Sequence, residues 1–246
     1  MNTRLLLAYD GTGFGGWAAQ PGVRTVEGVV TAALDRLHGT RGPVTVAGRT
    51  DAGVHATGQV VTVSLADGPP TEALHRALND VLPPDVAALA AETAPEGFSA
   101  RFDATARSYV YSVRRGVVRD PMRASQELHE PRRLDRGLLD ELADLVVGSH
   151  DFTAFTPIET EHRTFRRTVE AARWVDTEHG LAFEITANAF LRHMVRTLVG
   201  NMIVTARGDR HAGTRSFAEL LEGAPRTAAG WTAPPHGLCL VHVRYP

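Results

Sequence analysis

Apolar and polar positions alternate along the first hundred residues in two distinct patterns. From Val26 to Leu37 the apolar positions recur at helical spacing, with Thr25 able to cap the start and Gly39 able to end the helix. Residues 71–82 show the same amphipathic pattern. Short apolar runs predict strands at residues 4–10, 44–48, 58–65 and 85–92. Because the connections are too short for a doubly wound parallel sheet, the pattern favours an antiparallel α+β arrangement.

A second round of elements follows in a similar order. The pattern predicts strands at residues 106–115, 167–175, 181–187 and 238–245, and helices at 134–147, 189–207 and 216–221. Residues 120–133, rich in proline and arginine, are expected to form a long irregular connection. The similar order indicates two halves of related architecture.

Composition narrows the class of protein. The 246 residues can form one large domain or two small ones, and the 43% hydrophobic and 22% charged content is typical of soluble globular chains. No apolar run approaches the length needed to cross a bilayer. The apolar segment at the N-terminus is too short for a signal peptide and continues directly into a strand pattern. We therefore expect a cytoplasmic protein that does not associate with membranes.

Cysteine and histidine usage gives no support for a metal site. The single cysteine, Cys239, excludes a disulfide within the chain and a thiolate cluster. Its apolar neighbours favour a buried strand cysteine over a nucleophile. The eleven histidines include no HExxH motif. We expect neither a bound metal nor a cofactor.

The charge pattern leaves nucleic-acid binding open. A net charge of −2 does not indicate a nucleic-acid partner. All 26 basic residues are arginine, which a GC-rich genome would explain, yet arginine also grips phosphate and stacks on bases. Two arginine-rich runs stand out, at residues 114–123 and 163–167. Each is either a basic contact surface or a solvated charged face.

The segment from Gly11 to Trp17, GTGFGGW, is similar to a phosphate-binding glycine loop only in composition. It lacks the Gly-Lys-Ser/Thr ending, and no helix pattern begins at the right place. A tight turn that packs Trp17 onto the core is the better interpretation.

A lone carboxylate, Asp51, lies in the segment VAGRTDAGVHATGQVV (46–61) with Arg49 before it and glycines on both sides. Aspartate in such a loop commonly caps its own backbone in an Asx turn. The alternative is a nucleophile that a substrate can approach closely and that a nearby arginine keeps ionised. No second carboxylate is found to act as the acid of a retaining glycosidase. This favours chemistry in which the leaving base stays in the site.

The segment AGRTDAGVHATGQV resembles the active-site motif of the bacterial tRNA pseudouridine synthase A family. Other segments match that family in order: YDGTGFGGWAAQ (9–20), ALNDVLPPDV (77–86), FSARFDATARSYVYSV (98–113), ANAFLRHMVRTLVG (187–200) and GLCLVHVRYP (237–246). The resemblance spans essentially the whole chain. The sequence departs from the family pattern at two places, and both concern the range of substrates. Ala18 replaces a more usual glutamine. The segment EHRTFRR (161–167) is an unusual form of a loop that usually carries a cysteine before its arginine.

The resemblance implies the α+β pseudouridine synthase fold, with two similar halves around a central antiparallel sheet and the active-site cleft between them. Residues 1–105 would carry the catalytic aspartate, and residues 106–246 would complete the active site and the dimer interface. It also implies isomerisation of uridine to pseudouridine in tRNA, at positions 38, 39 and 40 of the anticodon stem-loop, by a homodimer without a cofactor.

The resemblance assigns three catalytic residues. Asp51 matches the nucleophile, and attack at C6 of the base and action at the ribose both stay open. Tyr109 matches an active-site tyrosine that would stack on uracil and help to move the C5 proton; without the resemblance it reads as a core strand aromatic. Arg196 matches the basic partner of the catalytic carboxylate, and would share a helix face with Arg192. The alternative for Arg196 is a surface arginine.

Substrate contacts are expected from residues around these positions. A uridine in a stem-loop must leave its stack before chemistry, and arginines can offset that cost. His55 either contacts RNA or braces the loop. The expected substrate-binding residues are Arg49, His55, Phe98, Arg101, Phe102, Arg163, Arg166 and Arg167.

Two other functions stay open. One is the same isomerase chemistry on a different RNA or on a nucleotide. The other is a catalytically idle RNA-binding or RNA-folding protein, against which the presence of Asp51, Tyr109 and Arg196 argues.

Overall fold

The computed structural model describes residues 1–160, 162–208 and 213–246, which form two compact units. The first unit comprises Met1–Arg107 together with Cys239–Pro246, and the second comprises Ser108–Leu238. The last strand, β10 (Leu238–Arg244), pairs with a strand of the first unit.

The first unit is built on a mixed sheet. Strand β1 (Asn2–Tyr9) pairs antiparallel with β3 (His55–Ser64) and β4 (Val86–Thr93), and the short β2 (Thr45–Val46) pairs antiparallel with β3. Strand β10 pairs parallel with β3, so the sheet is not purely antiparallel as expected. A parallel pair needs a long connection, and residues 65–237 supply one.

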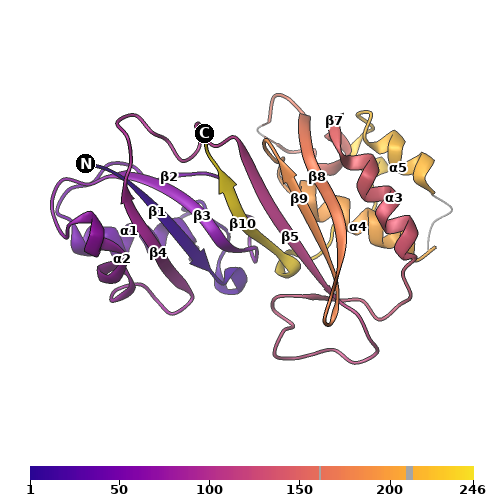
Figure 1. The fold of residues 1–246 in the computed structure, drawn as a ribbon, viewed down its shortest axis with the longest axis horizontal. Coiled ribbons are helices and arrows are strands. Elements are labelled where there is room, and N and C mark those ends of the chain that lie inside the picture. Colours follow the sequence, from indigo (N-terminus) through magenta and orange to yellow (C-terminus); the bar gives the residue numbers. More distant parts are fainter. Residues whose placement is uncertain (161, 209–212) are drawn as a thin grey trace. The chain divides into compact units, whose positions relative to one another are not determined.

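Two helices complete the first unit, as the hydrophobic pattern predicted. Helix α1 (Val26–Leu37) begins where the Thr25 hydroxyl accepts a hydrogen bond from the Gly28 amide at 3.3 Å. Helix α2 (Thr71–Asn79) packs on β4 (Figure 1). The predicted turn is a short 3₁₀ helix (Gly11–Gly13), and Trp17 is fully buried, as expected.

The second unit carries the remaining strands. Its antiparallel strands are β7 (Gly148–Asp151), β8 (Arg166–Thr177) and β9 (Gly180–Ala187). Strand β5 (Ala106–Arg114) lies next to β9, and β6 (Leu128–His129) pairs parallel with β5. Helices α3 (Arg136–Val146), α4 (Met194–Ala206) and α5 (Thr214–Leu220) pack together beside β8 (Figure 1). Three further 3₁₀ helices cover Thr153–Phe155, Arg226–Ala228 and Pro235–Gly237.

Helix α4 starts later than its sequence pattern predicted. The expected start was Ala189, but the helix begins at Met194 because His193 adopts a left-handed conformation with φ of 62°. Arg192 therefore lies before the helix, and the prediction that Arg192 and Arg196 share one helix face is wrong. From Met194 onward the helix is almost completely buried.

The connection between β5 and α3 is irregular apart from β6, as its proline and arginine content predicted. Arg114 anchors it by pairing with Asp120 at 3.1 Å and with Glu127 at 2.8 Å. In the part of the chain that the structure describes, no helix combines the length and apolar character that a membrane span requires.

Candidate active site

Asp51 is half-buried in a loop between β2 and β3 that main-chain hydrogen bonds hold on several sides. The Trp17 amide donates to the Thr50 carbonyl at 3.0 Å, and the Gly53 amide donates to the Phe14 carbonyl at 3.2 Å. The Val54 amide donates to the Asp51 carbonyl at 3.1 Å, so the main chain itself closes the turn. Asp51 therefore lies in a loop whose backbone is fixed.

Two glycines in the segment that follows β1 allow this close packing. A β-carbon at Gly11 would lie 2.1 Å from the Val54 carbonyl oxygen, and one at Gly16 would lie 2.9 Å from the Thr50 carbonyl oxygen. Gly16 also has a positive φ of 98°, which glycine adopts at little cost. These glycines thus hold the loop that carries Asp51. The sequence did not predict this contact between the glycine-rich segment (Gly11 to Trp17) and the segment that carries Asp51.

Three buried polar side chains hold the loop from its inner side. The Tyr9 hydroxyl lies 2.8 Å from the Thr50 hydroxyl. The Gln59 amide donates to the Tyr9 hydroxyl at 3.2 Å and to the Gly48 carbonyl at 2.7 Å. Burial raises the pKa of Tyr9 above its ordinary value, so this phenol stays neutral.

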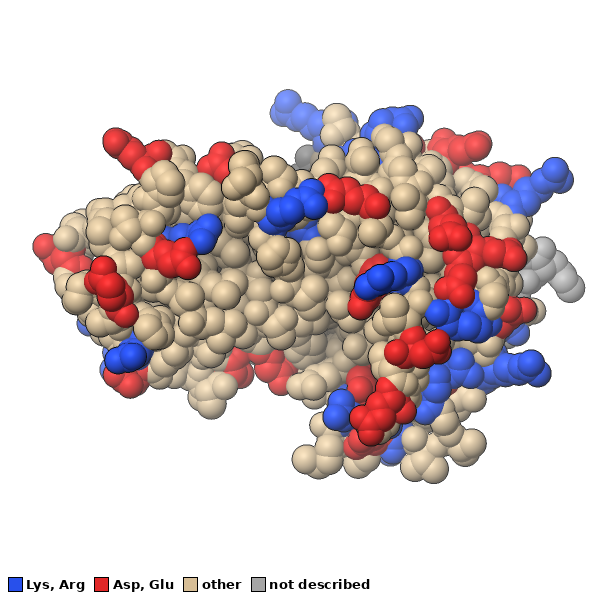
Figure 2. All heavy atoms as spheres, viewed as in Figure 1, with Lys and Arg blue, Asp and Glu red and all other residues tan. Residues whose placement is uncertain are grey.

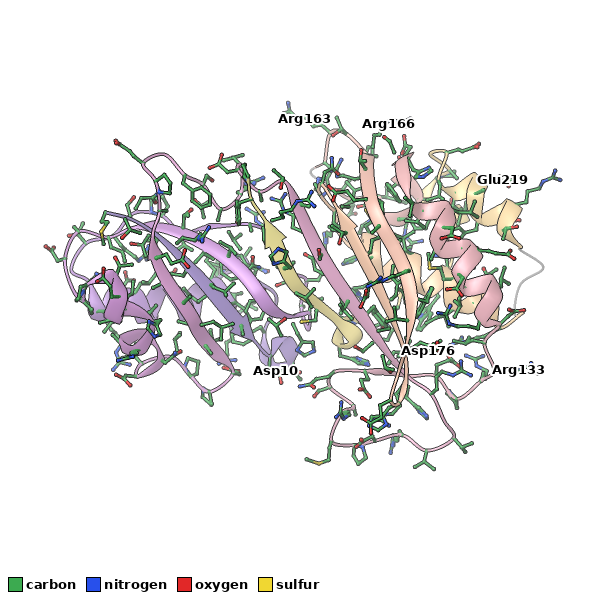
Figure 3. The ribbon with its side chains drawn as sticks, viewed as in Figure 1. Asp10, Arg133, Arg163, Arg166, Asp176 and Glu219 are labelled. Carbon is green, nitrogen blue, oxygen red and sulfur yellow. The ribbon has the colours of Figure 1, made fainter. Side chains whose placement is uncertain are left out.

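His55 contacts the turn after β1. Its Nδ1 atom lies 3.0 Å from the Gly11 amide nitrogen and 3.2 Å from Asp10 Oδ1. Asp10 stands at the end of β1 (Figure 3) and accepts hydrogen bonds from the amide and hydroxyl of Thr12. Burial acts to raise the pKa of Asp10, but the bonds from Thr12 and the proximity of His55 outweigh it and lower that pKa. These contacts favour the bracing alternative for His55.

The expected RNA contacts of the first unit differ in exposure. Arg49 is exposed, and Phe102 is 79% exposed with the Arg101 guanidinium 5.4 Å from its ring centre. Phe98 instead packs on Tyr245, with ring centres 5.0 Å apart. Phe102 and Arg101 therefore offer a stacking surface and a cation to a ligand, whereas Phe98 braces the segment from inside.

Arg107 is a structural residue that no sequence pattern pointed to. Its guanidinium donates to the carbonyls of Ala47 at 2.8 and 3.1 Å, Arg101 at 2.9 Å and Ala104 at 3.0 Å. Only a planar group with several donors can bind three carbonyls in this way. Arg107 thereby ties the segment that carries Arg101 to the residue at which the Asp51 loop begins.

Tyr109 is buried on β5 of the second unit. It is 7% exposed, and its ring packs edge-on against Phe190 with ring centres 5.0 Å apart. This packing agrees with a core aromatic and also with a rigidly held active-site ring.

Arg196 lies half-buried in the first turn of α4. Its Nε atom donates to the Ala233 carbonyl at 2.9 Å, and its own carbonyl accepts from the Ala233 amide at 3.0 Å. Nearby, burial raises the pKa of Tyr111, an effect that the charge of Arg196 partly opposes.

The arginine-rich run at residues 163–167 contains two exposed arginines. Arg163 and Arg166 are exposed at one end of β8, while Asp176 lies at the other (Figure 3). Arg167 is half-buried, donates to the carbonyls of Thr164 and Arg166, and has a pKa lowered by burial. Glu161, the first residue of EHRTFRR, lies outside the described residues. On the face of the second unit visible in Figure 2, acidic and basic side chains intermingle.

Neither cysteine chemistry nor a metal centre stands out in the described part of the chain. Cys239 lies on β10 as expected but is only partly buried, 3.9 Å from the Thr57 hydroxyl. Burial raises the pKa of its thiol, which disfavours the thiolate. Among the described residues, no cluster of three or more His, Cys, Asp or Glu side chains could hold a metal ion.

Comparison with known proteins places this α+β chain, in which Asp51 lies in a fixed loop, in one family. The family model described as tRNA pseudouridine synthase matches residues 6–103 and 142–246. The chain belongs to this family. Asp51 and Arg196 fall inside the matched segments, and Tyr109 falls between them.

Individual relatives match over nearly the full chain. The tRNA pseudouridine synthase A of Roseiflexus sp. (strain RS-1) is 42% identical, covering 100% of this chain and 91% of the relative. The protein of that name from Frankia casuarinae is also 42% identical, covering 99% and 89%. The one from Bacillus subtilis (strain 168) is 38% identical, covering 100% and 99%.

Proposed function

We propose that this protein isomerises uridine to pseudouridine in the anticodon stem-loop of tRNA, at positions 38, 39 and 40, with Asp51 as the nucleophile. The observation that carries the proposal is the loop that presents Asp51. Its backbone is fixed by the Trp17 and Gly53 hydrogen bonds and by close contact with Gly16. A rigidly held carboxylate is what nucleophilic catalysis at an acetal-like carbon or at a pyrimidine requires.

The chemistry of the reaction involves no redox step. The N1–C1′ bond breaks, the uracil turns, C5 bonds to C1′, the C5 proton leaves, and N1 gains a proton. Substrate and product have the same atoms and the same oxidation state. The reaction therefore needs no oxidant, reductant or co-substrate. In the proposal Tyr109 stacks on the uracil and assists the loss of the C5 proton, and Arg196 supplies the positive charge that keeps the nucleophile ionised.

Binding of the RNA is proposed to use the exposed cations and the exposed aromatic residue. Arg49 lies in the same loop as Asp51, two residues before it, and the Arg101 guanidinium lies over the Phe102 ring. Extracting a uridine from its stack costs a few kcal/mol, which stacking and phosphate contacts can offset. Arg163 and Arg166 are proposed as further phosphate contacts. The resemblance also supports a homodimer acting in the cytoplasm.

The test is isomerisation by the purified protein on unmodified tRNA transcripts, with each pseudouridine mapped to its position. Pseudouridine at positions 38 to 40, formed without any added cofactor, is the expected result. Transcripts in which those uridines are replaced by cytidine serve as the matched control and should stay unmodified. Modification confined to another RNA, or to free nucleotides, would overturn the proposed substrate. Binding of tRNA without any isomerisation would favour a non-catalytic RNA-binding protein.

A further inference from the structure

Hydrogen bonds connect three buried side chains at the inner side of the loop that carries Asp51. Tyr9 is 4% exposed, Thr50 is 6% exposed and Gln59 is fully buried. Tyr9 lies on β1, Thr50 in the loop and Gln59 on β3. Their hydrogen bonds therefore connect the loop to two neighbouring strands of the first unit.

The direction of two of the three hydrogen bonds follows from their partners. The Gly48 carbonyl can only accept, so the Gln59 amide group must present its nitrogen there at 2.7 Å. The second proton of that nitrogen then points at the Tyr9 hydroxyl, 3.2 Å away. The Tyr9 and Thr50 hydroxyls lie 2.8 Å apart, and either of them can be the donor. In both cases this hydrogen bond holds the Thr50 side chain from inside the protein.

Gln59 is not the residue at this buried position that would give the folded state the greatest stability. Its Oε1 atom is buried and has no hydrogen-bond partner among the described residues. A buried acceptor without a partner destabilises the folded state, and an apolar side chain of similar size would remove that cost. The feature that an apolar residue cannot reproduce is the pair of donors directed at Gly48 and Tyr9. Gln59 therefore serves the geometry of the loop more than the stability of the fold.

We propose that Tyr9 and Gln59 are positioning residues that aim Asp51 by fixing the chain on both sides of Arg49. This inference rests on the proposed function, because the effect on catalysis is measured as kcat for isomerisation of tRNA. Gln59 fixes the carbonyl of Gly48, Tyr9 fixes the side chain of Thr50, and the Trp17 amide fixes the Thr50 carbonyl. The peptide that leads into Asp51 is thus restrained at three points. A nucleophile displaced by about 1 Å can lose about a hundredfold in rate, so such restraint matters to catalysis.

The experiment compares four single variants and one double variant, Tyr9→Phe/Thr50→Val, with one control. Tyr9→Phe removes only the hydroxyl, Gln59→Met removes both donors, Thr50→Val removes the Thr50 hydroxyl, and Thr50→Ser keeps a hydroxyl there. The control is Thr3→Val, because Thr3 is fully buried on the same strand as Tyr9 and its hydroxyl has no hydrogen-bond partner among the described residues. For each variant, kcat and KM on tRNA, the melting temperature, and hydrogen exchange of residues 47–54 are measured.

We expect Tyr9→Phe, Gln59→Met and Thr50→Val each to lower kcat about tenfold or more, with KM within about twofold. Gln59→Met removes the orphaned acceptor but also the two hydrogen bonds that Gln59 donates, so its kcat is compared with its melting temperature. Thr50→Ser and Thr3→Val should behave as the parent. The Tyr9→Phe/Thr50→Val double variant should lose no more than the worse single variant, because the two residues act through one contact. Exchange of residues 47–54 should rise in the three disrupting variants only.

Three results would overturn the inference. The first is an unchanged kcat in Tyr9→Phe and Gln59→Met. The second is a kcat that falls only in step with the melting temperature. The third is unchanged exchange of residues 47–54. If the parent forms no pseudouridine in any tRNA, the proposed function fails instead, and the exchange measurement still decides whether Tyr9 and Gln59 fix the loop.

Discussion

Gly16 lies directly against Thr50, with no room between them for a side chain. A β-carbon at Gly16 would come within 2.9 Å of the Thr50 carbonyl oxygen and 3.2 Å of the Ala52 amide nitrogen. Because the two segments are so close, the Trp17 amide can donate a hydrogen bond to the same Thr50 carbonyl at 3.0 Å. The glycine-rich segment after β1 and the loop that carries Asp51 are therefore one structural feature, although more than thirty residues separate them in sequence.

This packing predicts that Gly16→Ala damages both stability and activity. The positive φ of 98° disfavours any β-carbon, at about 1–2 kcal/mol. The contact with Thr50 adds about 1–3 kcal/mol for overpacking and displaces the loop. We expect a loss of about 2–5 kcal/mol by denaturant unfolding, together with a kcat reduced about tenfold or more.

Gly22→Ala is the matched control, because Gly22 has a similar positive φ of 72° but no atom within 4 Å of the place that a β-carbon would occupy. It should cost only the backbone term, about 1–2 kcal/mol, and leave kcat unchanged. Equal effects of the two substitutions on kcat would show that the close approach to Thr50 has no catalytic importance.

Acid should remove the stabilisation that Asp85 provides. Arg24 donates to both oxygens of Asp85, at 2.7 and 2.9 Å, and these bonds lower the pKa of the carboxyl despite a smaller opposing effect of burial. A carboxyl whose pKa is lower in the folded state stabilises the fold above its unfolded pKa of about 3.9, and that stabilisation is lost as pH falls through the lower folded value.

Asp85→Asn should therefore lower the free energy of unfolding by about 0.5–1 kcal/mol at pH 7, since both side chains are partly exposed. The difference from the parent should shrink below about pH 4. Glu92→Gln, in the more exposed pair with Arg4, is the control and should change stability less at pH 7. A difference that grows as pH falls would contradict the assigned role of Asp85.

The exposed arginines at one end of β8 predict salt-dependent tRNA binding. Each phosphate contact contributes a slope of about −0.9 to the dependence of log affinity on log salt, using duplex DNA as a guide. Replacing Arg163 and Arg166 together by alanine should flatten that slope by about one to two units and leave the single-turnover rate on bound tRNA unchanged. Arg167 is unsuitable for this test because it is half-buried and its guanidinium donates to two carbonyls of its own segment.

Arg173→Ala is the control for the loss of charge, because Arg173 lies on the same strand and is already paired with Glu184 at 2.6 Å. It should leave the slope nearly unchanged. A slope that the double variant does not alter would place the RNA away from this end of β8.

Arg196→Met should lower kcat about a hundredfold or more, since the proposal gives Arg196 the charge that keeps the nucleophile ionised. Arg192→Met is the control: the same substitution four residues earlier, on an exposed residue before the helix. It should leave kcat unchanged. The melting temperature must be followed, because Arg196 also bonds the Ala233 carbonyl. Equal kcat values for the two variants would remove Arg196 from the catalytic residues.

The hydrophobic pattern was sufficient to predict most elements and their order. It located helix α1 with its Thr25 cap and the strands β1, β5 and β9 to within a few residues. It missed β7, Gly148–Asp151, because four mostly polar residues carry no strand periodicity. It also started α4 five residues early, since the apolar run continues through a left-handed residue that no pattern marks.

The sequence was sufficient to predict the candidate catalytic residue. It was not sufficient to predict the residues that hold its loop in place. Asp51 stands out in sequence because an isolated carboxylate lies between glycines and next to arginine. The contacts of Tyr9, Gln59 and Arg107 depend on pairings between residues about 40 to 60 positions apart, and local sequence carries no signal for them. The parallel pairing of β10 with β3 has the same origin, because it is set by tertiary packing.

The central claim is that Asp51 is the nucleophile, and Asp51→Asn tests it most directly. The amide keeps the shape of the side chain and loses the nucleophilic carboxylate. Asp67→Asn, at an exposed position of the same unit, is the matched control. Single-turnover isomerisation of tRNA should fall at least about a thousandfold in Asp51→Asn, with tRNA binding and melting temperature unchanged, and stay at the parent rate in Asp67→Asn. Isomerisation by Asp51→Asn at a rate near that of the parent would contradict the account.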